Sequence, residues 1–351
     1  MTELMNHMPV APDQSIGVVV VTFSSADVIA GCLDSLVAQD GARPTVVVVD
    51  NASTDTTLSE LRAWAAARCG DAGRAVMQEI GPGVATAELD GPQVILLHSG
   101  ANRGFAGGVN LGLALLARRP GIKHFWILNP DACADPKAAQ SILAAARQTP
   151  DYGMMSGRIC YAEPPFHIQS DGGTINWWTG VTGNINARLR ADTAVLPDAR
   201  VVDFVCGANM VASRRFYETV GPMQEDYFLY YEEVDWAVRG GVLPLIVAPG
   251  FVAHHHAGTS IGSQTPTRIA TPFSIWFLYR GRMRFVRRFH PLALPITLAY
   301  ATAKAGQLFL KGAYPQAVTL LGAIFGLPAP KAIRSRLSAE AGRIAFGKAR
   351  Q

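Results

Sequence analysis

Four short apolar runs in the first part of the chain predict four β-strands. They cover Ile16–Phe23, Thr45–Val49, Val94–His98 and His124–Leu128, and each is rich in valine, isoleucine or leucine. The apolar residues in each run are consecutive, whereas a strand with one face in water alternates between apolar and polar residues. We therefore expect strands that are buried on both faces of a parallel sheet.

Helical spacing of apolar residues follows three of these runs, over Ala26–Gln39, Thr57–Ala67 and Gly108–Arg118. Strands that alternate with helices form βαβ crossovers. The pattern therefore predicts an α/β fold with an open, twisted, mostly parallel sheet flanked by helices. Residues 152–200 are rich in glycine, asparagine and aromatic residues, and we expect mixed strands and loops there. From Phe273 onward the chain is predicted to be mainly helical.

The composition excludes several classes of protein. At roughly 150 residues per domain, 351 residues correspond to two domains or to one large α/β domain with additions. With 49% hydrophobic and 17% charged residues, the chain can bury a large core, which excludes a mainly disordered or coiled-coil protein. The net charge of +4 is too small to indicate nucleic-acid binding.

The N-terminus and the cysteines together predict a cytoplasmic location. Met1–Ser15 contains proline, aspartate and glutamate and lacks the basic and then apolar order of a signal peptide. The number of cysteines is odd and no Cys-x-x-Cys pair occurs. This disfavours a zinc cluster or a disulfide framework and indicates a reducing compartment. The five cysteines are Cys32, Cys69, Cys133, Cys160 and Cys206.

An apolar segment near the C-terminus has three interpretations. Leu292–Leu310 has nearly the length of a transmembrane helix, about 20 residues, but Pro295 and Lys304 interrupt it. An amphipathic helical tail on the inner membrane surface is more economical than a span. The third interpretation is a helix that packs on the rest of the protein. The tail beyond it contains the single acid Glu340 and the basic residues Lys331, Arg334, Arg336, Arg343, Lys348 and Arg350.

Polar clusters follow three of the predicted strands. These clusters are Asp50–Asp55, Asn102–Asn110 and Asn129–Asp131. In open α/β sheets, ligands bind beyond the carboxyl ends of the strands, so the three clusters would meet at one binding edge. Asp, Asn and Ser also favour turns and helix N-caps, which is the alternative explanation for each cluster alone.

A group of carboxylates among aromatic residues is the most informative chemical feature. Glu232, Glu233 and Asp235 lie within Tyr227–Arg239, and on a helix Glu232 and Asp235 share a face. Like charges beside apolar rings raise the pKa of at least one carboxyl group, which can create a general base that works near neutral pH. The alternative is an acidic helix N-terminus that the helix dipole favours.

Three adjacent histidines, His254, His255 and His256, offer an imidazole for a metal ion, and Asp131 offers a carboxylate oxygen. We expect at most one of the three on the metal. One carboxylate and one imidazole make a sparse site that suits Mn²⁺ or Mg²⁺, with water and a substrate diphosphate as the other ligands. The pair Trp177 and Trp178 is consistent with either a sugar-stacking platform or core packing.

These residues, in this order, resemble the inverting family-2 glycosyltransferases of the GT-A fold, in the branch that contains bacterial rhamnosyltransferases and galactofuranosyltransferases. The resemblance extends from Val18 to about Arg288. It rests on several ordered motifs, which are Val19–Ser25, Val48–Asp55, Asn102–Asn110, Leu128–Asp131, Tyr231–Asp235, His255 and Tyr279–Arg282. Two residues depart from the family pattern: Glu233 replaces the usual aspartate, and Gly281 replaces an asparagine.

The resemblance implies a donor site for a nucleotide-diphospho-sugar. Asp50 would bond the pyrimidine base, and the glycine-rich loop would let the main chain approach the donor. The donor-binding residues implied are Thr22, Phe23, Asp50, Asn51, Ser53, Asn102, Gly104, Phe105, Gly107, Asn110 and Asn129. The implied organisation is a tail (1–15), a GT-A catalytic domain (16–272) with a nucleotide-binding half (16–135) and an acceptor half (136–272), and a helical, basic extension (273–351).

The resemblance also implies a reaction, an inverting transfer of a sugar to a hydroxyl of a glycan or lipid-linked glycan. Glu233 would take the proton of the acceptor, and Glu232 and Asp235 would shape the acceptor site. Asp131 and His255 would hold Mn²⁺ or Mg²⁺. The branch suggests dTDP-L-rhamnose as the donor, with UDP-sugars such as UDP-galactofuranose as alternatives. The basic residues Arg280, Arg282, Arg284, Arg287 and Arg288 would face diphosphate or anionic lipid, or solvent.

Two other classes of function remain as alternatives. An NAD-dependent oxidoreductase would need Gly-x-Gly-x-x-Gly after the first strand, and residues 22–25 contain no glycine. A degenerate, membrane-associated carbohydrate- or nucleotide-sugar-binding protein would not need its acids, yet all four are intact at positions 131, 232, 233 and 235.

Overall fold

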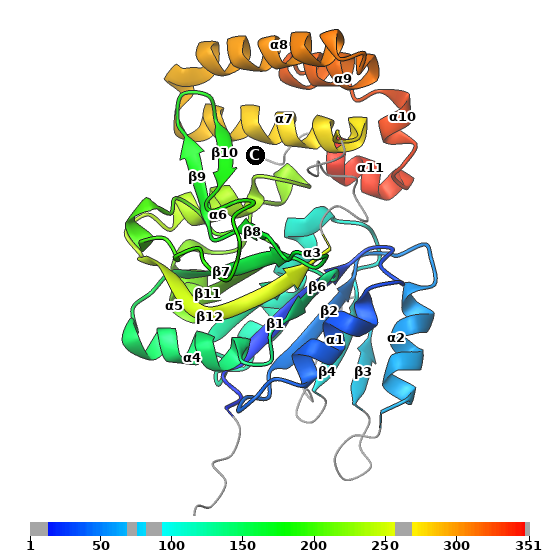
Figure 1. The fold of residues 1–351 in the computed structure, drawn as a ribbon. Coiled ribbons are helices and arrows are strands. Elements are labelled where there is room, and N and C mark those ends of the chain that lie inside the picture. The colour runs from blue at the N-terminus through cyan, green and yellow to red at the C-terminus, as the bar shows by residue number, and fades with distance from the viewer. Residues whose placement is uncertain (1–12, 69–75, 82–92, 257–268, 348–351) are drawn as a thin grey trace, which may run out of the picture.

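The computed structural model describes residues 13–68, 76–81, 93–256 and 269–347. Residues 1–12 of the predicted tail, Cys69, Lys348 and Arg350 lie outside the described residues. Figure 1 shows two parts, a twisted sheet with helices on its faces and a layer of helices stacked above it.

The first part contains the predicted parallel sheet. The strands run in the order β3-β4-β2-β1-β5, and each neighbouring pair is parallel. The four predicted strands are confirmed, and the structure adds β3, a short edge strand with one buried residue. Their bounds are β1 (Ile16–Thr22), β2 (Thr45–Asp50), β3 (Met77–Ile80), β4 (Val94–His98) and β5 (His124–Leu128).

Both faces of this sheet are buried, as the apolar runs predict. On β1, Val19 and Val21 pack into the cluster that contains residues of α3 (Gly104–Ala117). Val18 and Val20 point to the other face, where they pack against α1 (Ile29–Val37) and α2 (Thr57–Ala66). Side chains alternate between the two faces of a strand, so only a consecutive apolar run can fill both cores.

The helix α3 begins four residues earlier than Gly108, the first residue of the predicted helix. The predicted glycine-rich loop is therefore mostly the first turns of a helix, and this part of the prediction is wrong. A Cβ atom added at Gly108 would lie 2.5 Å from Cγ1 of Val21. The glycine at this position thus lets the helix pack closely on β1.

The second part of the sheet is mixed rather than parallel. Strand β11 is antiparallel to both β5 and β7, β7 is parallel to β12, and β6 and β8 pair antiparallel at the margin. Its strands are β6 (Ala132–Ala134), β7 (Met154–Tyr161), β8 (Ile168–Ser170), β11 (Asn209–Ser213) and β12 (Leu245–His255), with the hairpin β9 (Gly173–Asn176) and β10 (Val181–Asn184) beside them. Its helices are α4 (Ala138–Gln148), α5 (Arg214–Val220) and α6 (Glu232–Arg239).

The C-terminal part is helical, as predicted. Helix α7 (Pro272–Phe289) lies between the sheet domain and the outer pair α8 (Leu294–Leu310) and α9 (Tyr314–Ile324), as Figure 1 shows. The short helices α10 (Lys331–Arg334) and α11 (Ala339–Phe346) descend from this layer toward the sheet. Within the described ranges, no helix has both the length and the apolar character needed to cross a membrane.

Candidate active site

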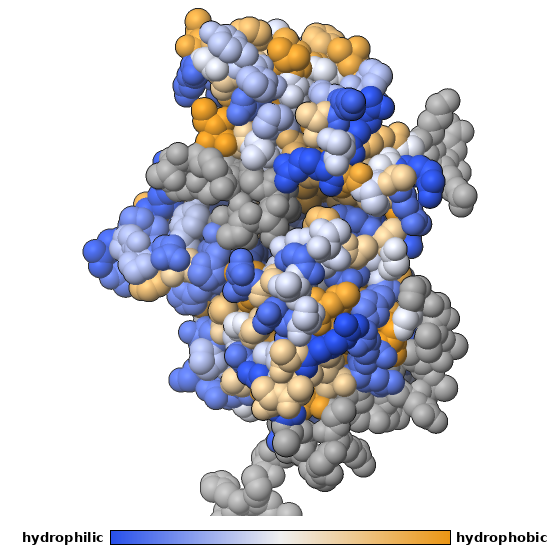
Figure 2. Space-filling model, turned by 90° about the vertical axis from the view of Figure 1, so that its right-hand side faces the viewer, coloured by the Kyte–Doolittle hydropathy of each residue, from blue (hydrophilic) through white to orange (hydrophobic). Residues whose placement is uncertain are grey.

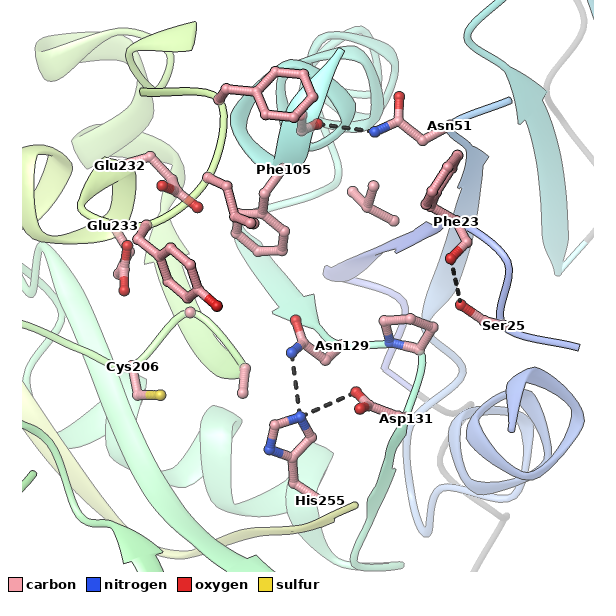
Figure 3. Close-up of a pocket in the computed structure, with 18 of the residues that line it drawn as sticks. Phe23, Ser25, Asn51, Phe105, Asn129, Asp131, Cys206, Glu232, Glu233 and His255 are labelled. Carbon is pink, nitrogen blue, oxygen red and sulfur yellow. Dashed lines mark hydrogen bonds and ion pairs between the residues drawn. The ribbon is translucent and has the colours of Figure 1, made fainter. Parts of the chain in front are cut away.

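A cavity of about 420 Å³ lies beyond the carboxyl ends of the central parallel strands. Phe23 follows β1, Asn51 follows β2, and Asn129 follows β5, and all three line the cavity. Glu232 and Glu233 line it from the opposite side, at the start of α6 (Figure 3). The predicted polar clusters therefore meet at one edge of the sheet.

The predicted site residues divide into two groups by their position. Ten line the cavity, and they are Phe23, Asn51, Asn102, Gly104, Phe105, Asn129, Asp131, Glu232, Glu233 and His255. Six are not among the lining residues, and they are Thr22, Asp50, Ser53, Gly107, Asn110 and Asp235.

Asn51 joins the ends of two elements that are remote in sequence. Its Nδ2 donates a hydrogen bond of 2.9 Å to the carbonyl of Gly104, and its Oδ1 accepts one of 3.0 Å from the backbone N–H of Arg103. The buried amide thereby fixes the start of α3 against the end of β2. One wall of the cavity is held rigid by these bonds.

Three predicted donor-binding residues shape the turns behind this wall. The Asp50 carboxylate accepts a hydrogen bond of 3.1 Å from the N–H of Ser53, and the Ser53 hydroxyl accepts one of 3.0 Å from the N–H of Ser24. The carbonyl of Thr22 accepts a hydrogen bond from the N–H of Asn51. These contacts match the alternative explanation, in which Asp and Ser satisfy turn backbone groups.

The two predicted residues within α3 also have structural contacts. The Asn110 side chain donates to the carbonyl of Met223 and to Glu225 and accepts from the N–H of Met223, so it ties α3 to the segment before α6. Gly107 is buried in the helix beside Arg103 and Glu225. The structure places neither residue at the cavity, because the segment is helical from Gly104.

Asp131 and His255 come together at the lower edge of the cavity in Figure 3, where Asp131 Oδ1 lies 3.0 Å from His255 Nε2. The opposite ring nitrogen, Nδ1, lies 2.8 Å from Oε1 of Gln169, an oxygen that can only accept. A hydrogen bond from Nδ1 to Gln169 would leave the lone pair of Nε2 for a metal ion that Asp131 also binds. A carboxylate oxygen and an imidazole oriented in this way suit Mn²⁺ or Mg²⁺.

Asp131 and His255 do not form part of a larger cluster of possible ligands within the described residues. Within the described part of the chain, no group of three or more His, Cys, Asp or Glu side chains is placed to hold a metal ion. Two such side chains would leave most coordination positions of a metal ion to water and substrate.

The structure distinguishes the three adjacent histidines. The side chain of His255 is buried and lines the cavity. His254, on the other face of β12, packs edge-on against Phe166, and the exposed His256 lies 3.6 Å from Glu163. The alternation of side chains along a strand selects one histidine of the three.

Neither of the two acids at the start of α6 forms an ion pair with a described residue. Burial raises the pKa of Glu233 to about 7, and it raises the pKa of Glu232 well above its usual value, together with the charge of Glu233. The Oε2 atom of each side chain is buried and has no hydrogen-bond partner within the described residues. A buried carboxylate oxygen without a partner is costly, and an acceptor hydroxyl would supply that partner.

The comparisons with known proteins identify the family of the chain. The sequence model of glycosyl transferase family 2 matches residues 17–221. The chain belongs to this family. It is a glycosyltransferase, and its mostly parallel sheet with flanking helices is the GT-A fold.

Two curated proteins are similar to this glycosyltransferase at low identity. A hexosyltransferase of low-salt glycan biosynthesis from Haloferax volcanii is 25% identical over 195 residues, which cover 55% of this chain and 52% of the relative. The chain thus aligns with about half the length of that relative. An N-acetylglucosaminyl-diphospho-decaprenol L-rhamnosyltransferase from Mycobacterium tuberculosis is 27% identical over 266 residues, which cover 68% of this chain and 76% of the relative.

Two solved structures share the fold. One is the mannosyltransferase PcManGT from Pyrobaculum calidifontis in complex with GDP-Man and Mn²⁺, with a TM-score of 0.50 and 19% identity over 90% of this chain and 89% of that one. The other is S. aureus TarS 1-349 in complex with UDP-GlcNAc, with a TM-score of 0.50 and 13% identity over 94% and 85%. At these identities the likeness establishes the fold alone.

The third acid of the glycosyltransferase, Asp235, is not in the cavity. Its side chain is fully buried, accepts a hydrogen bond of 2.9 Å from the Tyr227 hydroxyl, and pairs with Arg239 at 2.7 Å and Arg288 at 3.0 Å. The carboxylate thus connects α6 to α7 and does not face an acceptor. The helical spacing that we expected to group Asp235 with Glu232 does not bring both to the cavity.

The basic residues of α7 do not share one environment. Arg282 is buried and its Nε donates a hydrogen bond of 3.0 Å to the Tyr231 hydroxyl, while Arg284 pairs with Asp226 at 3.3 Å. Arg287 and Arg288 are exposed, and Arg288 also pairs with Asp235 at 3.0 Å. Arg282 and Arg284 thus contact the segment before α6, while Arg280 donates a hydrogen bond to the carbonyl of Ala345 in α11.

That segment has an unusual backbone. Phe228, Tyr230 and Tyr231 have φ values of 64°, 66° and 72°, in the left-handed region that non-glycine residues rarely occupy. The Phe228 carbonyl accepts a hydrogen bond of 2.9 Å from the N–H of Phe105, and Phe228 stacks on Phe277 of α7. Strain of this kind persists where packing over-determines the backbone, and here it sets the direction of Glu232 and Glu233.

Several cavity residues have no signal in the local sequence pattern. Gln169 comes from β8, Thr182 and Asn184 from β10, and Cys206 from the loop before β11. Arg336 and Leu337 come from the C-terminal segment, about 80 residues after the histidines. Trp177 and Trp178 are not among the lining residues, and they contact Phe285 and His290 near the end of α7. They therefore form neither a sugar platform in this cavity nor part of a buried core.

Proposed function

We propose that this glycosyltransferase moves a sugar from a nucleotide-diphospho-sugar to a hydroxyl of a glycan or lipid-linked acceptor, with inversion at the anomeric carbon. The observation that carries the proposal is the opposition of two groups in one cavity. Glu232 and Glu233 each present an unpartnered Oε2, and Asp131 and His255 form an oriented ligand pair. We take residues 16–272 as the catalytic domain and 273–351 as its extension.

In this mechanism Glu233 is the general base. Its Oε2 accepts the proton of the acceptor hydroxyl as the oxygen attacks the anomeric carbon and the bond to the diphosphate breaks. A pKa of about 7 leaves a substantial fraction of Glu233 ionised at neutral pH, and a base of this pKa holds the proton well. Burial and the charge of Glu233 raise the pKa of the neighbouring Glu232 well above its usual value.

Asp131 and His255 would hold Mn²⁺ or Mg²⁺, which when bound neutralises charge on the leaving diphosphate. Gln169 orients His255 for this role through Nδ1. Phe23, Asn51 and Asn102 also line the cavity and would contact the nucleotide. We place Asp50, Ser53 and Thr22 behind them as residues that set the shape of the base-binding turn.

We propose dTDP-L-rhamnose as the donor, with UDP-sugars as alternatives. The support is the similarity to an L-rhamnosyltransferase whose named acceptor is a diphospho-decaprenol sugar. Membership of the family removes the dehydrogenase alternative.

The direct test is a panel of nucleotide-sugars incubated with the protein and Mn²⁺, in which released nucleotide is measured. We expect slow hydrolysis of one donor, its loss with EDTA, and recovery with Mn²⁺ or Mg²⁺. Binding of nucleotides without any turnover would indicate a carbohydrate- or nucleotide-sugar-binding protein instead. Full activity in EDTA would contradict the proposed role of Asp131.

We also propose that the outer layer of α8 and α9 rests on an anionic membrane surface. Residues 290–330, which include α8 and α9, contain Lys304 and Lys311 and no Asp or Glu. Large apolar side chains are exposed on this layer, and Figure 2 shows them in orange along its top. They include Leu292 at 84% exposure and Leu310 at 92%. Apolar side chains beside basic ones are typical of peripheral membrane contacts.

Sedimentation with vesicles tests this contact. We expect binding to vesicles that contain phosphatidylglycerol, weaker binding to phosphatidylcholine alone, and loss of binding in Leu310→Glu. Val242→Glu is the matched control, because Val242 is 98% exposed but lies before β12, outside α8 and α9. Equal binding of both variants to the two kinds of vesicle would contradict the proposal.

A further inference from the structure

The C-terminal segment contributes directly to the cavity that holds the acids. Arg336 and Leu337, between α10 and α11, line the same cavity as Glu233 and Asp131. The helical extension is therefore more than a support, because two of its side chains reach the space where the substrates would meet.

The position of this segment is fixed by packing. Ile333 is buried in a cluster with Phe273, Trp276 and Phe277. Beyond the linker, Arg280 of α7 donates a hydrogen bond of 2.8 Å to the carbonyl of Ala345. Anchors on both sides of residues 335–338 hold the linker at the rim of the cavity.

Arg336 stands out by its charge. The described residues that line the cavity include the carboxylates Asp131, Glu232 and Glu233, and Arg336 is the one lysine or arginine among them. Its guanidinium lies 4.6 Å from the centre of the Phe273 ring, and it makes no ion pair with any described residue. The stacked guanidinium is pre-oriented and keeps its donors available for an anion.

The surface around Arg336 is apolar. Phe228, Leu229, Phe273 and Leu337 line this part of the cavity, and the first three belong to the same aromatic cluster as the C-terminal segment. A cation beside an apolar wall matches a phosphate that is attached to a hydrocarbon chain. The polar amides that suit a nucleotide, those of Asn51 and Asn102, come instead from the ends of β2 and β4.

We propose that Arg336 binds a substrate phosphate, and that the apolar wall makes it the phosphate of a lipid-linked acceptor. The inference rests on the proposed function, since it assigns the acceptor of that reaction to this side of the cavity. A phosphate held by Arg336, with its hydrocarbon chain along Phe273 and Leu337, leaves the acceptor's sugar free to extend toward Glu233. Arg336 is thus a binding residue for the acceptor and takes no part in proton transfer.

Direct binding of farnesyl diphosphate in EDTA tests the phosphate contact without any metal ion. Farnesol and inorganic diphosphate test the chain and the phosphate separately, and the wild-type protein is expected to bind both more weakly. Loss of a hydrogen bond to a charged group corresponds to about 10-fold or more in affinity, so Arg336→Gln should bind farnesyl diphosphate at least that much more weakly. Arg336→Lys should recover part of the loss.

The matched control is Arg334→Gln, because Arg334 is exposed, lies two residues away and is not among the lining residues. This variant should bind farnesyl diphosphate like the wild type. The second measurement is the binding of nucleotide in the presence of Mn²⁺. If Arg336→Gln weakens nucleotide binding and leaves farnesyl diphosphate binding unchanged, the phosphate belongs to the donor and the acceptor assignment is wrong. If it changes neither, Arg336 is not a phosphate site.

Steady-state transfer separates this inference from the proposed function. In Arg336→Gln the KM for a lipid-linked acceptor should rise about 10-fold, while hydrolysis of the donor without acceptor stays at the wild-type rate. Absence of donor turnover in the wild-type protein would contradict the proposed function. An unchanged acceptor KM in a variant that still hydrolyses donor would contradict only the role of Arg336.

Discussion

The two walls of the cavity are built in different ways. The wall that carries Phe23, Asn51 and Asn129 consists of residues that directly follow parallel strands, and hydrogen bonds from Asn51 lock it to α3. The wall that carries Glu232 and Glu233 is assembled from α6, a strained aromatic segment and the C-terminal helices. The first depends on the sheet, and the second on packing between segments far apart in sequence.

This difference separates binding from chemistry. The wall formed by Phe23, Asn51 and Asn129, the strand wall, would bind the nucleotide and should tolerate changes in the helical extension. The wall that carries Glu232 and Glu233, the acid wall, positions the carboxyl groups. A change in its packing should therefore alter turnover more than it alters nucleotide affinity. Four predictions test this division.

The largest effect should come from Glu233→Gln. Loss of a general base costs about 10²–10⁴-fold in rate, so transfer should fall by that factor while nucleotide binding remains nearly unchanged. Turnover with a radiolabelled donor, and calorimetry with the nucleotide, measure the two effects. Glu60→Gln, at an exposed position on α2, is the control. Normal turnover in Glu233→Gln would contradict the assignment of this residue as the base. Glu232 would then be the candidate base, and Glu232→Gln would test it.

Asp131→Asn should have the next largest effect. An amide binds a metal ion more weakly than a carboxylate does, so less charge on the leaving diphosphate would be neutralised. We expect the rate of transfer to fall by about 100-fold. Titration of activity with Mn²⁺ should give a half-saturating concentration well above that of the wild type. The exposed Asp151→Asn should match the wild type. An unchanged Mn²⁺ titration in Asp131→Asn would show that the ion binds elsewhere.

Arg282→Met tests the acid wall through its packing. The buried guanidinium donates to the Tyr231 hydroxyl, which itself donates a hydrogen bond of 2.5 Å to the carbonyl of Gly180. Its removal should lower the free energy of unfolding by about 1–3 kcal/mol and lower kcat, with the nucleotide dissociation constant unchanged. Urea unfolding and steady-state kinetics measure these quantities. Arg287→Met, at an exposed position on the same helix, should be near neutral; equal effects in the two variants would argue against a specific role for Arg282.

The smallest effect concerns pH. Because burial raises the pKa of Glu233 to about 7, its base form increases as the pH rises, so kcat/KM should increase through about pH 7 and then level off. The stability has the opposite sign. The folded protein holds this proton more tightly than the unfolded chain, whose glutamate has a pKa near 4.5. The wild type should therefore lose stability as the pH rises from 4.5 to about 7.

Thermal unfolding of the wild type and Glu233→Gln at pH 5 and pH 8 measures this second effect. The variant should gain stability relative to the wild type at pH 8, where the wild-type side chain is ionised. A difference between the two proteins that is independent of pH would contradict a raised pKa at Glu233.

Much of the fold was accessible from the sequence because its signals are local. Consecutive valines in Ile16–Phe23 and Thr45–Val49 are typical of strands that are buried on both faces. The helical spacing between the two runs indicates a helical crossover that connects parallel strands. The edge strand β3 escaped prediction because only Ile80 of its four residues is buried. The start of α3 escaped because its glycines resemble a loop, although they serve close packing on β1.

The sequence by itself determined where the candidate catalytic and metal-binding residues lie along the chain. They include the acids at positions 131, 232 and 233 and one of three adjacent histidines. The tertiary structure decided which of these residues share a cavity. It selected His255 through the two faces of β12, turned Asp235 and the arginines of α7 into internal ties, and brought Gln169 and Arg336 to the rim. Periodicity along a chain reports which face of an element is buried, but contacts between distant segments depend on how the elements pack, and no local pattern encodes them.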